Sequence, residues 1–170
     1  MKFNSFPPNP LFTNDGEKIV YGHLVEQLPS GVDVFCNLEW IDQQDRREID
    51  FIVAIPDKGL VILEVKGGKV ETRGNSWRQF DRRTNEWHSL PIVHQLSREQ
   101  SILKDALKPI FGRSCPKIAK LLVTPETMFS FHATLPGMNR NMLVAKNQMS
   151  ELFQLMCAAL AVSYTHLRAH

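Results

Sequence analysis

Two apolar runs rich in Ile, Val and Phe dominate the stretch from Arg47 to Gly68. The turn sequence Pro56-Asp57-Lys58-Gly59 separates them, and this arrangement predicts a β-hairpin. We predict a three-residue loop in which Ile55 pairs with Gly59, or else a bulge elsewhere in the pair. Gly59 suits the left-handed position of a bulge that follows such a loop.

Three charged residues interrupt this apolar hairpin, where an unpaired buried charge costs several kcal/mol. They are Asp50 in the first run and Glu64 and Lys66 at the end of the second. Side chains at i and i+2 of a strand share a face, so Glu64 and Lys66 point the same way. The three-residue loop places Asp50 opposite Glu64, whereas a two- or four-residue loop places it opposite Val65 and on the other face.

The spacing of apolar residues along the rest of the chain predicts three helices and further strands. The helices are expected at 14–28, 91–111 and 148–162, and the strands at 32–41, 117–124 and 141–146. In the strand 32–41, we expect one face to carry Val34, Cys36, Leu38 and Trp40. Residues 43–47 read as a polar turn that leads into the hairpin.

This order of elements predicts an α/β domain with a central mixed sheet flanked by helices. We expect the domain to span 14–162, after an extended N-terminal arm at 1–13 that contains three prolines. Residues 163–170 fit poorly as a continuation of the last helix, and we interpret them as a truncated or non-native tail.

Two carboxylates and a lysine near the end of one hairpin are typical of a metal-dependent hydrolytic site. Carboxylate oxygens are hard ligands that Mg²⁺ or Mn²⁺ prefers, and a divalent ion activates water and neutralises phosphoryl charge. A lysine orients that water or stabilises the developing negative charge. The alternative interpretation of Glu64 and Lys66 is a solvated strand edge.

The spacing D-(x)13-E-x-K and the surrounding sequence EIDFIVAIP…GLVILEVKGG resemble the nuclease-related domain (NERD) family of the PD-(D/E)xK nuclease superfamily. The resemblance implies a restriction-endonuclease-like core and a metal-dependent DNA nuclease. By the resemblance, Asp50, Glu64 and Lys66 form the catalytic triad, and the Val65 carbonyl joins the two carboxylates as a metal ligand. The proline of the superfamily signature is replaced here by Ile49.

Two further residues are candidates for the same site. Glu17 begins the stripe that continues with Tyr21, Leu24 and Leu28, and it has either a helix-dipole role or a metal-ligand role. Gln95 lies on the edge of the apolar face of the helix 91–111. The resemblance implies that Gln95 points at the metal site as a catalytic residue, and the alternative is an ordinary position on the helix surface.

The net charge and the distribution of charged residues bear on whether the chain binds nucleic acid. The net charge of +2 for 170 residues does not by itself indicate nucleic-acid binding. The segment 66–83, however, contains six basic residues and only two acidic ones, with tryptophan and phenylalanine between them. This pattern makes candidate DNA-phosphate contacts of Lys69, Arg73, Arg78, Arg82 and Arg83. The alternative is a short solvated hairpin whose tryptophans cover the sheet edge.

The three cysteines are isolated, and they indicate neither a disulfide framework nor a zinc site. No apolar run is long enough for a membrane span and no signal sequence precedes the domain, so we expect a cytoplasmic protein. We also expect DNA as the partner, and the resemblance implies a fused or associated helicase. The leading hypothesis is a Mg²⁺- or Mn²⁺-dependent DNA nuclease. The alternatives are a catalytically weak DNA-binding accessory module and, least supported, a protein-binding scaffold.

Overall fold

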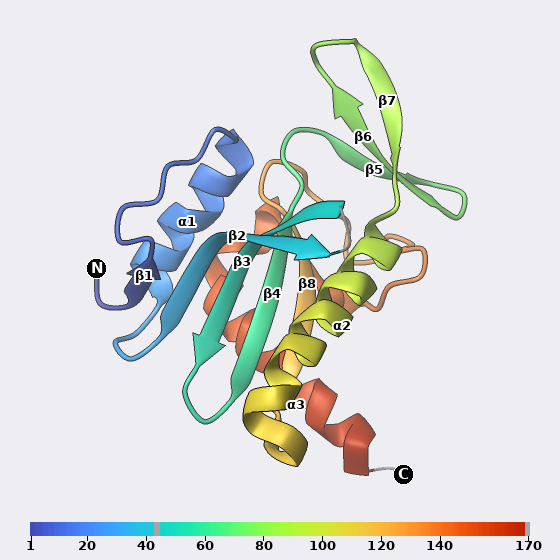
Figure 1. Ribbon diagram of the computed structural model, residues 1–170. Coiled ribbons are helices and arrows are strands. Elements are labelled where there is room, and N and C mark those ends of the chain that lie inside the picture. The colour runs from blue at the N-terminus through green and yellow to red at the C-terminus, as the bar shows by residue number, and fades with distance from the viewer. Residues whose placement is uncertain (43–44, 169–170) are drawn as a thin grey trace.

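A mixed six-stranded sheet forms the centre of the molecule (Figure 1). The computed structural model describes residues 1–42 and 45–168. It describes the side chains of these residues except at 42, 45 and 163–168. In spatial order, the strands are β1 (Asn4–Phe6), β2 (Asp33–Asp42), β3 (Asp45–Ile55), β4 (Gly59–Val65), β8 (Ile118–Thr124) and β9 (Leu143–Ala145). Strands β2, β3 and β4 are antiparallel neighbours, whereas β4, β8 and β9 run parallel.

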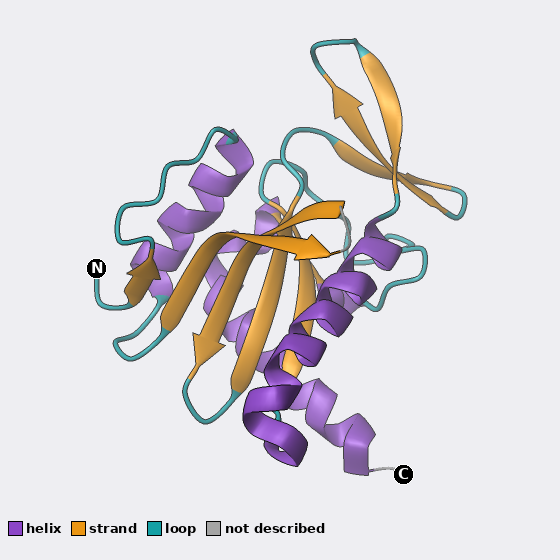
Figure 2. Cartoon of the chain, viewed as in Figure 1, coloured by secondary structure: helices purple, strands orange, loops and turns teal. Residues whose placement is uncertain are grey.

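Helices cover both faces of this sheet (Figure 2). Helices α1 (Asp15–Gln27) and α3 (Leu152–Arg168) pack on one face, and α2 (Ile92–Phe111) packs on the other. The predicted α/β class with a central mixed sheet is therefore confirmed. Within residues 1–42 and 45–168, no helix is both long enough and apolar enough to cross a membrane.

The predicted helices are present with modest shifts of their ends. Asn14 caps α1, because its side-chain oxygen accepts a hydrogen bond from the Gly16 N–H at 2.7 Å. The predicted last helix begins instead with a 3-10 segment, Lys146–Glu151, and α3 continues past Val162 to Arg168. The interpretation of 163–170 as a non-native tail stays a prediction.

The central hairpin has the predicted three-residue loop, with Ile55 paired to Gly59. Lys58 N–H donates to the Ile55 carbonyl at 3.1 Å, and Asp57 rather than Gly59 adopts a left-handed backbone with φ of 63°. Gly59, with φ of 137°, is needed for another reason, because a Cβ there would lie 2.5 Å from the Lys117 carbonyl oxygen. The turn therefore brings β4 close to the start of β8.

The predicted common face of Val34, Cys36, Leu38 and Trp40 is wrong at Leu38. Val34 and Cys36 pack toward α1 and α3, but Leu38 packs on the opposite side of the sheet. Asn37 lies between them with φ of 51°, and this left-handed residue interrupts the alternation of β2. The adjoining polar turn predicted at 43–47 lies partly outside the described residues, at 43–44.

A second sheet projects from the body between β4 and α2 and forms an arm (Figure 1). It consists of β5 (Val70–Arg73), β6 (Ser76–Asp81) and β7 (Glu86–Leu90), all antiparallel. The base of the arm is fixed to the body because Trp77 is buried against Phe129 and its indole N–H donates to the Pro136 carbonyl at 2.9 Å. Only residues 66–69 separate the end of β4 from the start of the arm.

Candidate functional site

The ladder between β3 and β4 ends where the candidate site begins. Its last regular pair is Phe51 with Leu63, and continuing that register places Asp50 opposite Glu64, as predicted. At this point the Val65 N–H donates to Asp50 Oδ2 at 2.8 Å. The carboxylate thus occupies the place that a β3 carbonyl would take in a continued ladder.

The alternation of β3 also changes at Asp50. Phe51 packs toward α1 and α3, whereas Ile49 packs on the α2 side with Leu38. A regular strand would put residues 49 and 51 on the same face. Asp50 and Asn37 lie at the same level of the two strands, between the pairs Cys36–Phe51 and Leu38–Ile49. The side chain of Asp50 therefore reaches along the edge of β4 and does not stand on the face that Glu64 occupies.

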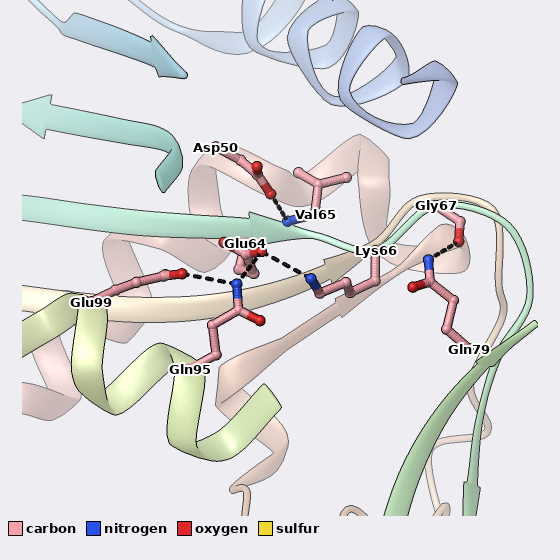
Figure 3. A network of polar contacts seen from close by, with 8 residues as sticks. All are labelled: Asp50, Glu64, Val65, Lys66, Gly67, Gln79, Gln95 and Glu99. Carbon is pink, nitrogen blue, oxygen red and sulfur yellow. Dashed lines mark hydrogen bonds and ion pairs between the residues drawn. The ribbon is translucent and has the colours of Figure 1, made fainter. Parts of the chain in front are cut away.

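Glu64 lies at the centre of a polar network on the α2 side of β4 (Figure 3). It is 3% exposed, and its Oε1 accepts hydrogen bonds from Lys66 Nζ at 3.0 Å and from Gln95 Nε2 at 2.6 Å. Strand alternation brings Lys66 to this position, and the first turns of α2 bring Gln95. The structure thus places three of the sequence-predicted residues in direct contact.

Glu17 approaches the site from the other face of the sheet. The start of α1 packs closely on the end of β4, because a Cβ on Gly16 would lie 2.9 Å from the Gly67 Cα. This contact needs glycine at position 16. The next residue, Glu17, lies close enough to interact with Asp50. Burial raises the pKa of Glu17 to about 7, and the charge of Asp50 and a hydrogen bond shared with it add to the rise.

The pKa values of Asp50 and Glu64 are raised as well. Burial raises the pKa of Asp50 to about 7, the nearby Glu64 charge adds to the rise, and the Val65 N–H opposes it. Burial raises the pKa of Glu64 to about 8 against the opposing effect of Lys66, with Glu99 adding to the rise. The site therefore gathers more carboxyl groups than its own lysine neutralises, and it favours a proton or a cation.

Glu99 is a residue of this network that sequence reasoning missed. It lies one turn after Gln95 on α2, is 5% exposed, and its Oε1 accepts from Gln95 Nε2 at 3.0 Å. Burial raises the pKa of Glu99, whereas its contacts with Glu64 and Gln95 oppose the rise. A signal for it exists in the sequence, since Ile92, Leu96, Glu99 and Leu103 form one stripe, with a carboxylate among buried apolar residues.

The five predicted DNA contacts all lie on or beside the arm, but their surroundings differ. Arg73, Arg82 and Arg83 are exposed at its turns. Arg78 forms an ion pair with Glu71 and lies over the Trp87 ring, and Lys69 Nζ lies 5.8 Å from the Phe80 ring centroid. The three exposed arginines are thus the better placed for an external partner.

Asp50, Glu64 and Glu17 have the chemistry of a site for a hard divalent cation. Glu64 Oε2 is buried and has no hydrogen-bond partner, so one oxygen remains available while Oε1 holds Lys66 and Gln95. Mg²⁺ is commonly held by only one or two carboxylates and otherwise by water and substrate oxygens. Within the described part of the chain, no three His, Cys, Asp or Glu side chains already surround one point. The donor set fits the ion, although binding must draw the carboxylates together.

One of the comparisons with known proteins found a match. The model of the nuclease-related domain matches residues 13–126, a range that includes α1, the hairpin, the arm and α2. No curated protein and no solved structure gave a match. The matched range contains every candidate site residue described above.

Proposed function

Because this chain belongs to the nuclease-related domain family, we propose that it is a Mg²⁺- or Mn²⁺-dependent nuclease that hydrolyses phosphodiester bonds in DNA. One observation carries the proposal. Asp50, Glu64 and Lys66 converge where β3 leaves β4, with Glu17 reaching Asp50 from α1. Burial raises the proton affinity of Asp50 and Glu64, and a bound divalent cation would offset this by stabilising the ionised carboxylates.

In this proposal, Asp50 and Glu64 hold the ion and Glu17 completes the carboxylate set. The Val65 carbonyl is a further ligand, since the N–H and C=O of one strand residue point to the same edge and the Val65 N–H points at Asp50. A bound divalent ion supplies Lewis-acid chemistry, which activates water and neutralises charge on the phosphoryl group.

Lys66 and Gln95 have separate roles in the proposed reaction. The Lys66 ammonium lies at the open end of β4, where it can donate to the attacking water or to a phosphoryl oxygen. Gln95 is a positioning residue, because its amide holds Glu64 Oε1 and so orients the second oxygen of that carboxylate. The ion pair with Glu64 also holds the Lys66 side chain in place.

The arm is the proposed DNA-positioning element. Arg73 lies at the β5–β6 turn, and Arg82 and Arg83 lie at the β6–β7 turn. Side chains of this kind contact phosphates without reading the base sequence. The backbone of the arm leads directly into the strand that carries Glu64 and Lys66, so DNA held by the arm lies at a fixed distance from the site.

The direct test is cleavage of labelled single- and double-stranded DNA by the purified chain in Mg²⁺, Mn²⁺ or chelator. We expect cleavage only with metal. Asp50→Asn and Glu64→Gln should each reduce the rate by more than about 100-fold, since even outer partners of metal ligands contribute about 10–100-fold. Asp105→Asn, an exposed change on α2, is the matched control. Equal cleavage in chelator and in both site variants would overturn the proposal.

A DNA-binding accessory module with little or no catalysis is the second candidate. It is favoured by the absence, among the described side chains, of three metal-binding groups already arranged around one point. DNA binding that persists without cleavage under every metal condition would support this candidate.

A further inference from the structure

Two aromatic side chains of the arm lie side by side without packing on the body. Phe80 of β6 pairs with Trp87 of β7, and their ring centroids are 5.3 Å apart at an interplanar angle of 59°. Both side chains are half-buried. Among the side chains that the structure describes, the apolar clusters of the body include Trp77 of the same arm but neither of these two. Because β6 and β7 extend away from the body, the pair is within reach of an external partner (Figure 1).

Strand alternation places this pair on the outer face of the arm. Trp77 is buried, and Gln79 Nε2 donates to the Gly67 carbonyl at the end of β4, at 2.8 Å. These two residues share one face of β6, which is therefore the face that attaches the arm to the body. Phe80 lies on the opposite face together with Arg78. The rings are thus not the side chains that anchor the arm.

A cleft connects Phe80 with the end of the catalytic strand. Phe80 and Arg82 from the arm, Gly67 and Asn14 are among the residues that line this cleft, which has a volume of about 190 Å³. Gly67 directly follows Lys66, and Asn14 caps α1. A chain that lies on the Phe80 ring and continues through this cleft therefore passes next to the end of β4.

Two cations border the aromatic pair. Lys69 Nζ lies 5.8 Å from the centroid of the Phe80 ring, and the guanidinium carbon of Arg78 lies 5.3 Å from that of the Trp87 ring. An ion pair with Glu71 holds the Arg78 guanidinium in this position. Aromatic rings and guanidinium planes are the surfaces on which proteins stack unpaired bases, while nearby positive charges attract the phosphates.

A structural role alone does not account for this surface. A cross-strand aromatic pair stabilises a small sheet, but it does so without any cation beside it, and apolar neighbours would bury its rings more completely. The arm instead surrounds the rings with charge, because residues 69–90 include five Lys and Arg and only three Asp and Glu. This combination of half-buried rings and positive charge is complementary to a polyanion that carries flat, apolar bases.

We propose that Phe80 and Trp87 stack on unpaired bases, so that the arm binds single-stranded DNA in preference to a continuous duplex. This inference rests on the proposed function and adds to it the form of the DNA and the residues that select it. In a duplex the bases stack on one another and their faces are covered, whereas the phosphates are open to Arg73, Arg82 and Arg83 in either form. The arginines thus supply affinity, and the aromatic pair supplies the preference.

The test measures binding by fluorescence anisotropy in chelator, with labelled oligo-dT, an abasic strand of the same length and a matched duplex. We expect wild type to bind oligo-dT more tightly than the other two. Phe80→Leu and Trp87→Leu should each weaken oligo-dT binding by at least about fivefold and leave abasic and duplex binding unchanged, because they remove stacking and no phosphate contact. Trp87→Phe keeps a ring and should retain most of the affinity. Phe131→Leu, which removes an exposed ring outside the arm, is the matched control and should bind as wild type does.

Several outcomes would overturn this inference. Equal losses with all three ligands would mean that the rings only maintain the shape of the arm, and unchanged oligo-dT binding in both leucine variants would leave the rings without a role. Equal affinity of wild type for oligo-dT and the abasic strand would contradict stacking without the use of any variant, so the test survives a variant that fails to fold in a thermal unfolding control.

Cleavage assays in Mg²⁺ separate this inference from the proposed function. Base-dependent binding of oligo-dT by a wild-type chain that cleaves no DNA would support the stacking surface and overturn the nuclease. Metal-dependent cleavage by a chain whose binding does not depend on bases would support the nuclease and overturn the stacking surface.

Discussion

Replacing Glu64 by glutamine should stabilise the metal-free protein, although it removes the proposed activity. Glutamine has nearly the same shape, and its carbonyl oxygen can accept the bonds that Lys66 and Gln95 now give to Oε1. The amide N–H₂ of the glutamine then takes the place of Glu64 Oε2, which has no hydrogen-bond donor in the wild-type protein. In this position it lies next to the Glu99 carboxyl group. The substitution thus removes a buried charge and supplies a donor to its neighbour.

The size and the sign of the effect follow from proton binding. Burial raises the pKa of Glu64 from the ordinary 4.5 to about 8. Between these values the folded state holds a proton that the unfolded chain releases, so the wild-type protein loses stability as pH rises from about 4.5 to 8. Each tenfold change in proton affinity is worth about 1.4 kcal/mol, and the full loss is therefore at most about 5 kcal/mol. Below pH 4.5 the glutamate contributes no such loss.

The assay is urea and thermal unfolding of both proteins in chelator across this pH range. Near pH 8, Glu64→Gln should be more stable by about 2–5 kcal/mol, a gain that raises Tm by roughly 5–15 °C for a chain of this length. The difference should shrink toward pH 4.5. Added Mg²⁺ should raise the Tm of wild type but not of the variant. Glu26→Gln, an exposed change on α1, is the control. Parallel stability curves for wild type and Glu64→Gln would refute the reasoning.

Two further predictions separate chemistry from DNA positioning. Lys66→Met should reduce cleavage by at least about 100-fold while DNA affinity, measured by fluorescence anisotropy, changes little, because the ammonium acts at the scissile phosphate. A large decrease in affinity would contradict this role. Arg82→Ala with Arg83→Ala should weaken DNA binding regardless of sequence and flatten the slope of log K against log salt by about 0.7–0.9 for each phosphate that an arginine no longer neutralises. An unchanged slope would assign these arginines to a solvated turn.

The hairpin register was predictable because loop length and strand alternation together allow few solutions. Only a three-residue loop, or a bulge, aligns Asp50 with Glu64, and the structure has that loop. The charged residues pointed to the site for a physical reason, since burial of unpaired charge is costly enough to require a function. The fold class followed from the order of helices and strands in the same way.

The position of the Asp50 side chain was not predictable from alternation. It depends on the end of the β3–β4 ladder and on the coupled irregularity at Asn37 and Asp50. A left-handed asparagine within a strand has no clear pattern in a single sequence, because asparagine is also common in turns. The same limit explains the incorrect face assigned to Leu38. The strand pairing within the arm was likewise not predictable, since three short strands with mixed polar and apolar residues can pair in several ways.

Glu99 was missed although the reasoning that found Glu17 applies to it. Both glutamates belong to helical stripes with offsets of 0, 4, 7 and 11. Glu17 begins its stripe, where a helix dipole offers an alternative explanation, whereas Glu99 is in the middle of α2, where none exists. A carboxylate inside an apolar stripe is therefore the stronger signal.

The attachment of the arm couples the proposed DNA contacts to the site. Directly after Lys66, the Gly67 carbonyl accepts from Gln79 Nε2 of β6 at 2.8 Å (Figure 3). Gly68 N–H donates to Glu126 Oε2 at 2.6 Å, and its carbonyl accepts from Thr127 Oγ1 at 2.7 Å. These bonds fix the two glycines, which would otherwise form a flexible hinge. Because the backbone between β4 and the arm is held on both sides, the proposed phosphate contacts of the arm have a defined position relative to Lys66. The proposed nuclease function requires this feature, since phosphate contacts carry no sequence information and the geometry of the bound DNA backbone then selects the bond to be cleaved.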